Sequence, residues 1–193
     1  MSDTGARKTR ASKNGSEKGP GSALKSKAGR KRLADKPVKD DQKAAASSHE
    51  LSVYSRRMLS LLAKEQEISQ GIFYIIDESE NKKILRILSA YAYDSTDTGN
   101  RIFELGEGFP GQVAIDGTLI NISEVPDGYV SIVSGLGSAK PASLIVFPVV
   151  YEDEVIAVVE LASFHRFSEE DEDFFTKFAN NVAVKIHGLL NSK

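Results

Sequence analysis

The sequence of 193 residues contains no cysteine. Disulfide bonds, thiolate metal sites, catalytic thiols and thioether attachment of a chromophore are therefore excluded. No apolar run approaches the roughly 20 residues that a membrane helix needs. The N-terminus also lacks the apolar core of a secretory signal. We therefore predict a cytoplasmic protein that makes no contact with a membrane.

Familiar catalytic motifs are also missing from the sequence. The three histidines, His49, His165 and His187, are widely separated, and neither G-x-S-x-G nor H-E-x-x-H accompanies them. The acidic run from Glu169 to Asp173 is a poor metal candidate, because five consecutive residues on a helix cannot all face one ion. We therefore predict a protein without enzyme activity, metal or cofactor.

Positive charge is concentrated at the N-terminus. Residues 1–43 hold thirteen Lys and Arg against five Asp and Glu, whereas the rest of the chain holds twelve basic and twenty-two acidic residues. Because this segment has few large apolar side chains, it cannot offset the entropy cost of ordering. We predict a disordered basic tail over 1–45 and one domain over 46–193. The run from Lys25 to Arg32 resembles nucleic-acid-binding arms, but it lacks an aromatic residue for base stacking, so a flexible leader is the favoured interpretation.

The pattern of apolar residues predicts an α+β domain. Spacings of three and four from Leu51 to Ile68 indicate a first helix. A last helix begins at Ser168, where Asp171 three residues on gives a capping-box arrangement. Runs of Ile, Val, Leu, Phe and Tyr predict strands at 70–77, 83–93, 101–105, 118–123, 143–151 and 154–164. The expected fold is a central antiparallel sheet in which the last two strands form the central hairpin.

The stretch LGEGFPGQVAIDG contains three glycines, Gly106, Gly108 and Gly111, in the spacing G-x-G-x-x-G. A dinucleotide site would need a long crossover helix after this turn, but the residues up to Gly117 leave room for only about two helical turns. Glu107 would also repel a pyrophosphate. We therefore predict that the glycines form a tight turn from a strand into a short helix.

Four motifs follow one another along the second half of the chain. They are G-E-G-x-x-G-Q-x-A at 106–114, V-P-x-x-Y at 125–129, S-G-L-G at 134–137 and E-L-A-S-F at 160–164. Their order resembles the GAF domain, a small-molecule and signal-sensing module of bacterial regulators and of some eukaryotic phosphodiesterases. The resemblance covers about Leu51 to Leu190 and is strongest to GAF domains of bacterial two-component and sensor proteins. The resemblance implies a ligand cavity on one face of the sheet, roofed by the connection 124–141. It also implies terminal helices on the other face, which often pair in a dimer.

If this architecture holds, the cavity is expected to be lined from the sheet by four apolar residues and from the roof by four more. A few polar groups should fix the ligand's orientation. The predicted ligand-binding residues are Phe73, Ile75, Tyr91, Phe103, Phe109, Gln112, Ser123, Tyr129, Ile132, Ser134 and Leu136. The alternative is that these side chains pack on one another as an ordinary core.

The resemblance also narrows the choice of ligands and reactions. Family members that bind cyclic nucleotides often carry Asn-Lys followed by Phe-x-x-x-Asp-Glu. Phe167, Asp171 and Glu172 match the second half, but Ala162 and Ser163 stand where Asn-Lys is expected. Cyclic nucleotide binding is therefore not expected. The methionine sulfoxide reductases of the family and its covalent bilin photoreceptors need cysteine, which this chain lacks.

These observations predict a non-catalytic sensory or regulatory module that binds a small molecule, a separate signalling protein, or both. Extra apolar width on the terminal helices predicts a homodimer. The residues that supply this width are Phe174, Phe175, Leu189 and Leu190. Two alternatives stay open: a ligand-free dimerisation scaffold with a collapsed pocket, and a nucleic-acid-associated factor acting through the basic tail.

Overall fold

The computed structural model describes residues 38–79, 82–93 and 102–192. The chain divides into two units, 1–36 and 37–193, and every described residue belongs to the second. Residues 1–37 of the predicted basic tail lie outside the described residues, and so does the basic run from Lys25 to Arg32. Residues 38–45 differ from the prediction, because they form the start of helix α1 (Val38–Glu65). Their sequence, VKDDQKAA, carries no periodic apolar stripe, so hydrophobic spacing could not detect this part of the helix.

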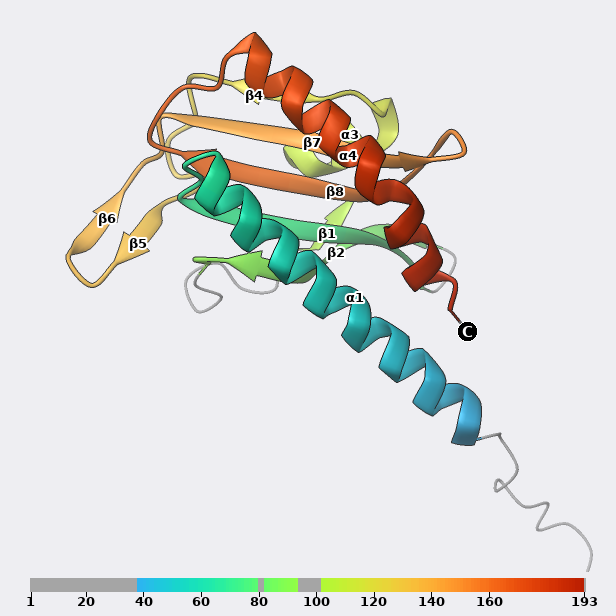
Figure 1. Cartoon of the computed structure of the whole chain (residues 1–193). Helices are drawn as coiled ribbons and strands as arrows, with labels where there is room; N and C mark the ends of the chain where they lie inside the picture. Colours follow the sequence, from blue (N-terminus) through green and yellow to red (C-terminus); the bar gives the residue numbers. More distant parts are fainter. Residues whose placement is uncertain (1–37, 80–81, 94–101, 193) are drawn as a thin grey trace, which may run out of the picture. The chain divides into compact units, whose positions relative to one another are not determined.

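The main sheet has six antiparallel strands in the order β3-β2-β1-β8-β7-β4 (Figure 1). Their bounds are β1 Gln70–Ser79, β2 Lys82–Tyr91, β3 Ile102–Glu104, β4 Ile120–Ile122, β7 Ser143–Tyr151 and β8 Glu154–Ser163. The predicted β7–β8 hairpin turns through Glu152 and Asp153, which both have positive φ, as a tight two-residue hairpin turn requires. The α+β prediction and the antiparallel sheet are confirmed.

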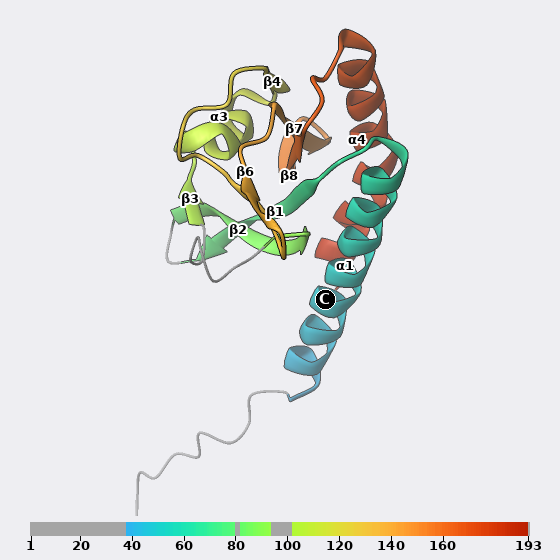
Figure 2. The same ribbon diagram turned by 90° about the vertical axis from the view of Figure 1, so that its left-hand side faces the viewer.

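Two helices cover one face of this sheet and the chain's middle section covers the other (Figure 2). On the first face, α1 and α4 (Glu169–Leu190) pack on side chains such as Phe73, Ile145 and Leu161. On the second face, the short helix α3 (Gly108–Asp116) packs with Val113 against Tyr74 and neighbours from β7 and β8. The sheet is therefore buried on both sides, as its continuous apolar strands indicate.

The connection after β4 contains a feature that the sequence pattern did not predict. Residues Ile132–Ser134 (β5) and Gly137–Ala139 (β6) form a separate two-stranded hairpin. Five of its six strand residues are exposed. Strands of three residues without a buried face give no alternation of apolar and polar residues, which explains why the pattern did not show them.

Both predicted helix ends are confirmed. Ser168 caps α4 in a capping box: its hydroxyl accepts from the Asp171 amide at 3.3 Å, and its own amide donates to the Asp171 carboxylate at 2.8 Å. Helix α3 ends at Gly117, whose φ of 63° is left-handed. A Cβ on Gly111 would lie 2.4 Å from the Glu104 carbonyl oxygen. The glycine-rich turn is thus explained by backbone packing alone.

Candidate functional site

The roofed face of the sheet is apolar except at its centre. Strand register places Glu160 of β8 between Ile72 of β1 and Val146 of β7. Next to this row, Gln70 of β1 pairs with Ala162 of β8. Because side chains on paired strands that share a face lie side by side, Glu160 and Gln70 form a polar pair inside an aliphatic surface.

The Glu160 carboxylate is buried, with 5% of the residue exposed. The hydroxyl of Tyr74, which is itself fully buried, donates to Glu160 Oε2 at 2.8 Å. Taking a carboxylate out of water costs several kcal/mol, and hydrogen bonds of this kind offset part of that cost. Gln70 is equally buried, and its Nε2 donates to the Ala92 carbonyl at 3.0 Å.

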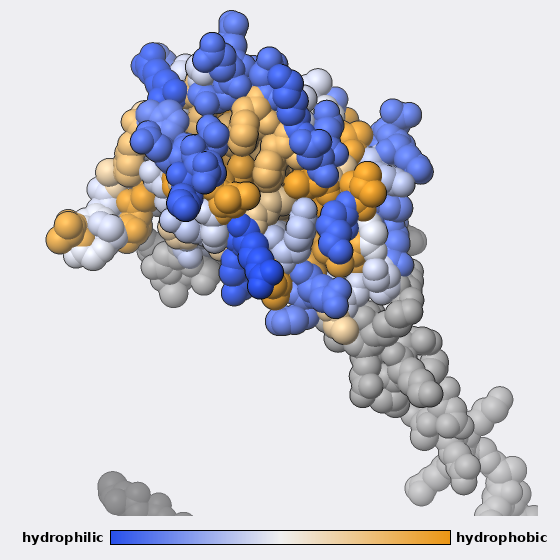
Figure 3. Space-filling model, in the orientation of Figure 1, coloured by the Kyte–Doolittle hydropathy of each residue, from blue (hydrophilic) through white to orange (hydrophobic). Residues whose placement is uncertain are grey.

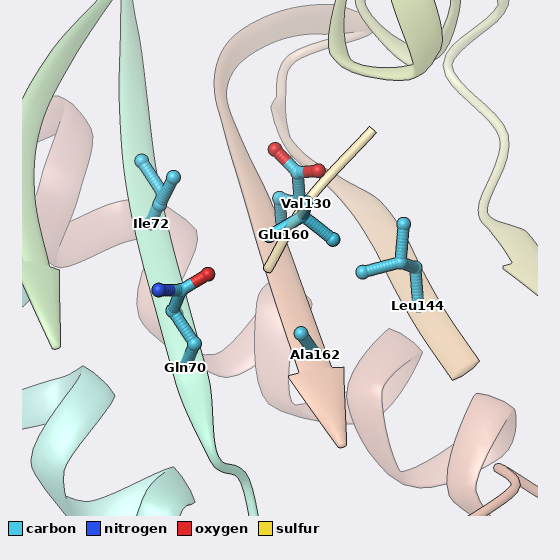
Figure 4. Close-up of a pocket in the computed structure, with 7 residues that line it drawn as sticks. Gln70, Ile72, Val130, Leu144, Glu160 and Ala162 are labelled. Atoms are coloured by element: carbon cyan, nitrogen blue, oxygen red, sulfur yellow. The ribbon is translucent and has the colours of Figure 1, made fainter. Parts of the chain in front are cut away.

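These two polar side chains line a small cavity. Its volume is about 10 Å³, which is about the space of a single water molecule. The lining residues are Gln70, Gly71, Ile72, Val130, Leu144, Glu160 and Ala162. Figure 4 shows the side chains from β1, β8 and β7 projecting toward the place where Val130 of the connection lies.

The connection closes this cavity as a packed roof. Val125 is buried against Leu144 and Ala162, and Tyr129, Val130 and Ile132 pack on the same cluster. Tyr129 also lies against Phe109 of α3, with ring centroids 4.9 Å apart. An ion pair between Lys140 and Asp127, at 2.5 Å, joins the two ends of the roof. A ligand larger than water can enter only if part of this roof moves.

The structure places four of the eleven predicted site residues on the roofed side of the sheet, where they are half-buried. Phe103 packs edge-on against Tyr74, with centroids 5.8 Å apart, and Phe109, Tyr129 and Ile132 belong to the roof clusters. All eleven belong to the described part of the chain, and none of them lines the cavity.

Three predicted sheet residues are on the wrong face. Phe73, Ile75 and Tyr91 pack with the core beneath α1 and α4. Successive strand residues point to opposite faces, so an error of one position moves a side chain across the sheet. In the run GIFYII both the odd-numbered and the even-numbered positions are apolar. An alternation of apolar and polar residues therefore could not show which positions face which side of the sheet.

The remaining four predicted residues are on the surface. Leu136 is fully exposed at the tip of the β5–β6 hairpin, and Ser134 beside it accepts from the Leu136 amide at 3.2 Å. Gln112 is exposed on α3 and donates to Asp116 at 2.7 Å. Ser123 is exposed in the connection. These polar groups form local turn and helix contacts, and they do not meet at the cavity.

Glu160 and Gln70 are the polar groups that sequence reasoning missed. Glu160 is a single acid within the apolar run VIAVVELA. An ionisable residue in a strand predicted to be covered on both faces was an available signal, since buried charges need a partner. Gln70 carried a weaker signal, because it is the first residue of its strand.

The motif residues that resemble a cyclic nucleotide signature have structural roles. Phe167 is buried in the helix-side core and Asp171 belongs to the α4 capping box. Glu172 accepts from Asn121 Nδ2 at 2.8 Å, and the same nitrogen donates to the Phe167 carbonyl at 3.1 Å. These contacts tie β4 to the start of α4.

A serine–histidine pair lies near the end of β8, but its geometry does not suit a nucleophile. Ser163 is fully buried, and its hydroxyl donates to the Glu67 carbonyl at 3.0 Å. Because that bond uses the only hydroxyl proton, His165 Nδ1, 2.7 Å away, must be the donor to Ser163 Oγ. A general base would instead accept the serine proton.

Comparison with known proteins assigns the fold to a family. The sequence model of the GAF domain matches residues 48–187. The chain belongs to the GAF domain family. GAF domains typically serve as regulatory modules for small molecules or signalling. No curated protein sequence matches this GAF chain significantly.

Solved structures similar to this GAF chain include both regulatory domains and enzymes. The GAF domain of a Coxiella burnetii phosphoenolpyruvate-protein phosphotransferase has 18% identity and a TM-score of 0.57, over 76% of this chain and 95% of that one. A free methionine-R-sulfoxide reductase from Thermoplasma acidophilum has 20% identity and a TM-score of 0.58, over 74% and 96%. The corresponding Neisseria meningitidis enzyme, solved with its substrate, has 17% and 0.59, over 79% and 89%. At such identities the likeness shows the fold alone.

Among the helices in 38–79, 82–93 and 102–192, none is long and apolar enough to cross a membrane. The same residues contain no group of three or more His, Cys, Asp or Glu arranged to hold a metal ion.

Proposed function

We propose that this GAF chain is a non-catalytic sensory module that binds a small molecule in the cavity between the sheet and the connection 124–141. The observation that carries the proposal is the buried carboxylate of Glu160, which lies beside Gln70 at the centre of the roofed face and lines the cavity. Small-molecule sites are mostly apolar with a few placed polar groups, which is the composition of this lining.

Binding would be transmitted through movement of the roof. A ligand that occupies the cavity must displace Val130, which lines it, and so favours a conformation of the connection different from the packed one. Helices α1 and α4 pack on the opposite face of the same strands. A ligand that binds one roof conformation more tightly shifts the equilibrium between the two, and these helices would report the shift to a partner protein.

The same helices offer a surface for a homodimer. Val53 and Leu61 of α1 and Val184 of α4 are exposed apolar residues, 37%, 54% and 68% exposed. Figure 3 shows apolar side chains among strongly hydrophilic ones on this side of the domain. Of the four residues predicted to widen the apolar stripe, only Phe174 is exposed, whereas Phe175 and Leu189 are buried within the subunit and Leu190 is half-buried.

Native mass spectrometry of the full purified chain tests ligand binding and oligomeric state together. We expect a dimer mass and a retained small molecule that Glu160→Gln releases. Glu154→Gln is the matched control, because Glu154 is an exposed carboxylate on the same strand. A monomer mass that does not change with concentration would contradict the dimer, and a retained compound unaffected by Glu160→Gln would contradict the cavity as its site.

The second candidate function is a dimerisation scaffold without a ligand. The observation that favours it is the closed roof, which leaves a cavity of only about 10 Å³. An empty dimer, with an amide exchange rate in the roof that no added compound changes, would support the scaffold over the sensor.

A further inference from the structure

A groove lies at the surface of the helical layer, between α1 and α4. The two helices are neighbours on the same face of the sheet (Figures 1 and 2). The groove has a volume of about 340 Å³, which is within the range of small-molecule sites. Five residues of α1 and two of α4 line it, and none of them lines the cavity beneath the roof. The groove is therefore a separate and much larger space.

The floor of the groove is apolar. Leu189 of α4 is buried, and Tyr54 of α1 is half-buried against the same helix-side core. Val53 lies beside them in the lining and is 37% exposed. An apolar floor that remains open to solvent gives a bound compound a surface on which to bury its own apolar part.

The same groove carries two cationic side chains. Arg57 follows Val53 by one helical turn on α1, and Lys185 precedes Leu189 by one turn on α4, so that each cation shares a helical face with an apolar floor residue. Both cations are exposed, and neither forms an ion pair with another described residue. This is unusual in residues 44–193, which hold twelve basic and twenty-two acidic residues.

The acid of the lining does not neutralise the cation at Arg57. Glu50 precedes Arg57 by seven positions on α1, which is about 10 Å along the helix axis. His49 and Glu50 thus line one end of the groove and Arg57 lines the other. Negative charge on a ligand is favoured at the Arg57 end and disfavoured beside Glu50.

We propose that this groove is a second ligand site, which takes a small organic anion with an apolar body, such as an aromatic carboxylate. The planar guanidinium of Arg57 matches a carboxylate in a bidentate pair, and the ammonium of Lys185 adds a second positive charge. The apolar body would lie on Val53, Tyr54 and Leu189, where an aromatic ring can pack against the Tyr54 ring.

This inference goes beyond the proposed function, because it needs neither Glu160 nor movement of the roof. It also leaves Leu61 and Val184 of the proposed dimer surface uncovered, since neither lines the groove. The chain's own N-terminal segment is a poor occupant: residues 1–43 hold thirteen Lys and Arg against five Asp and Glu, and this positive charge would be repelled by Arg57 and Lys185.

Three probes with the same ring and different charge test the assignment. The anion 2-naphthoate, the neutral 2-naphthalenemethanol and the cation 2-naphthylmethylamine are each titrated into the full-length protein at pH 7 and low ionic strength, with binding followed by calorimetry. We expect 2-naphthoate to bind about fivefold more tightly than the alcohol, and the amine to bind most weakly. Added salt should weaken the binding of 2-naphthoate alone, because exposed charges are screened.

Substitutions connect this preference to the groove. Arg57→Gln and Lys185→Gln should each reduce 2-naphthoate affinity about fivefold, the upper end for an exposed ion pair. Arg56→Gln is the matched control, because Arg56 is an exposed arginine of the same helix that does not line the groove, and it should change nothing. Glu50→Gln should raise the affinity by removing a repulsive charge. Glu160→Gln should leave it unchanged.

Equal affinity for the three probes, no binding of 2-naphthoate, or equal losses in Arg56→Gln and Arg57→Gln would overturn the groove as an anion site. Loss of binding in Glu160→Gln with none in Arg57→Gln would place the probe in the roofed cavity and would also overturn it. If Glu160→Gln does not fold, the comparison of Arg56→Gln with Arg57→Gln decides the question. None of these results depends on whether the roofed cavity binds its own ligand, so the two proposals fail separately.

Discussion

The hydrogen bond between Tyr74 and Glu160 gives a quantitative test of the buried charge. Tyr74→Phe removes the hydroxyl that donates to Glu160 Oε2 at 2.8 Å in a fully buried position. A hydrogen bond to a charged group contributes about 1.5–3 kcal/mol to stability. For a domain of this size, one kcal/mol corresponds to about 2–4 °C in Tm, so the loss should lower Tm by roughly 3–12 °C.

The charge itself is tested by the double-mutant cycle with Glu160→Gln. The amide of this variant can still accept from Tyr74, so the cycle separates the charge of the acceptor from the hydrogen bond itself. In the Glu160→Gln background the bond is neutral, and Tyr74→Phe should cost only about 0.5–1.5 kcal/mol. The expected coupling free energy is therefore about 1 kcal/mol.

Urea unfolding followed by circular dichroism measures the four proteins of this cycle. The two sites are in contact, so coupling is expected. If Tyr74→Phe costs the same in both backgrounds, the carboxylate is not the charged acceptor that we describe.

Three further predictions concern the roof and the helix ends. Gly111→Ala should lower the free energy of unfolding in urea by at least about 2 kcal/mol, because its Cβ would lie 2.4 Å from a backbone oxygen. Gly135→Ala, which has open space around its Cβ, is the control and should change this free energy by less than about 0.5 kcal/mol. Similar losses in the two variants would contradict the packing argument. Ser168→Ala should cost about 1 kcal/mol by removing the α4 cap, and an unchanged midpoint would show that the cap contributes nothing. The hydrogen bond and charge of Lys140 hold the pKa of Asp127 below its usual value of 3.8, so the roof contact is fully present above pH 4 and is lost as pH falls through the lowered pKa. The protection factors of the amides in 124–141, which are corrected for the intrinsic exchange rate at each pH, should therefore fall below pH 4 in the wild-type protein. They should not show this fall in Lys140→Gln, and an equal fall in both proteins would refute the contact.

The sequence predicted the fold well because its strongest signals are local. The capping box at Ser168 and Asp171, the end of α3 at Gly117 and the β7–β8 hairpin each depend on a few neighbouring residues. The roof over one face came from the family resemblance, and the packing of Val125 and Tyr129 on that face is consistent with it.

The side of the sheet that each residue faces was predicted less well, because it depends on register. Phe73 and Ile75 were assigned to the roofed face, but Ile72 and Tyr74 are there, whereas Phe73 and Ile75 pack beneath the terminal helices. One position along β1 separates the two sets, and an apolar strand covered on both faces gives no alternation to choose between them. Glu160 was visible in the sequence as an acid in an apolar run, but only the pairing with Ile72 and Val146 shows that it lies at the centre of the face.

The central claim, that the roofed cavity is a small-molecule site with Glu160 as its anchor, is tested most directly by competitive affinity selection. The wild-type chain and Glu160→Gln are each incubated with an equimolar mixture of small aliphatic amines, carboxylates and neutral compounds, and retained compounds are identified by mass spectrometry. We predict that the wild-type protein retains at least one compound from this mixture and that Glu160→Gln does not retain it. Retention of nothing by the wild-type protein, or of the same compounds by both proteins, would contradict the claim.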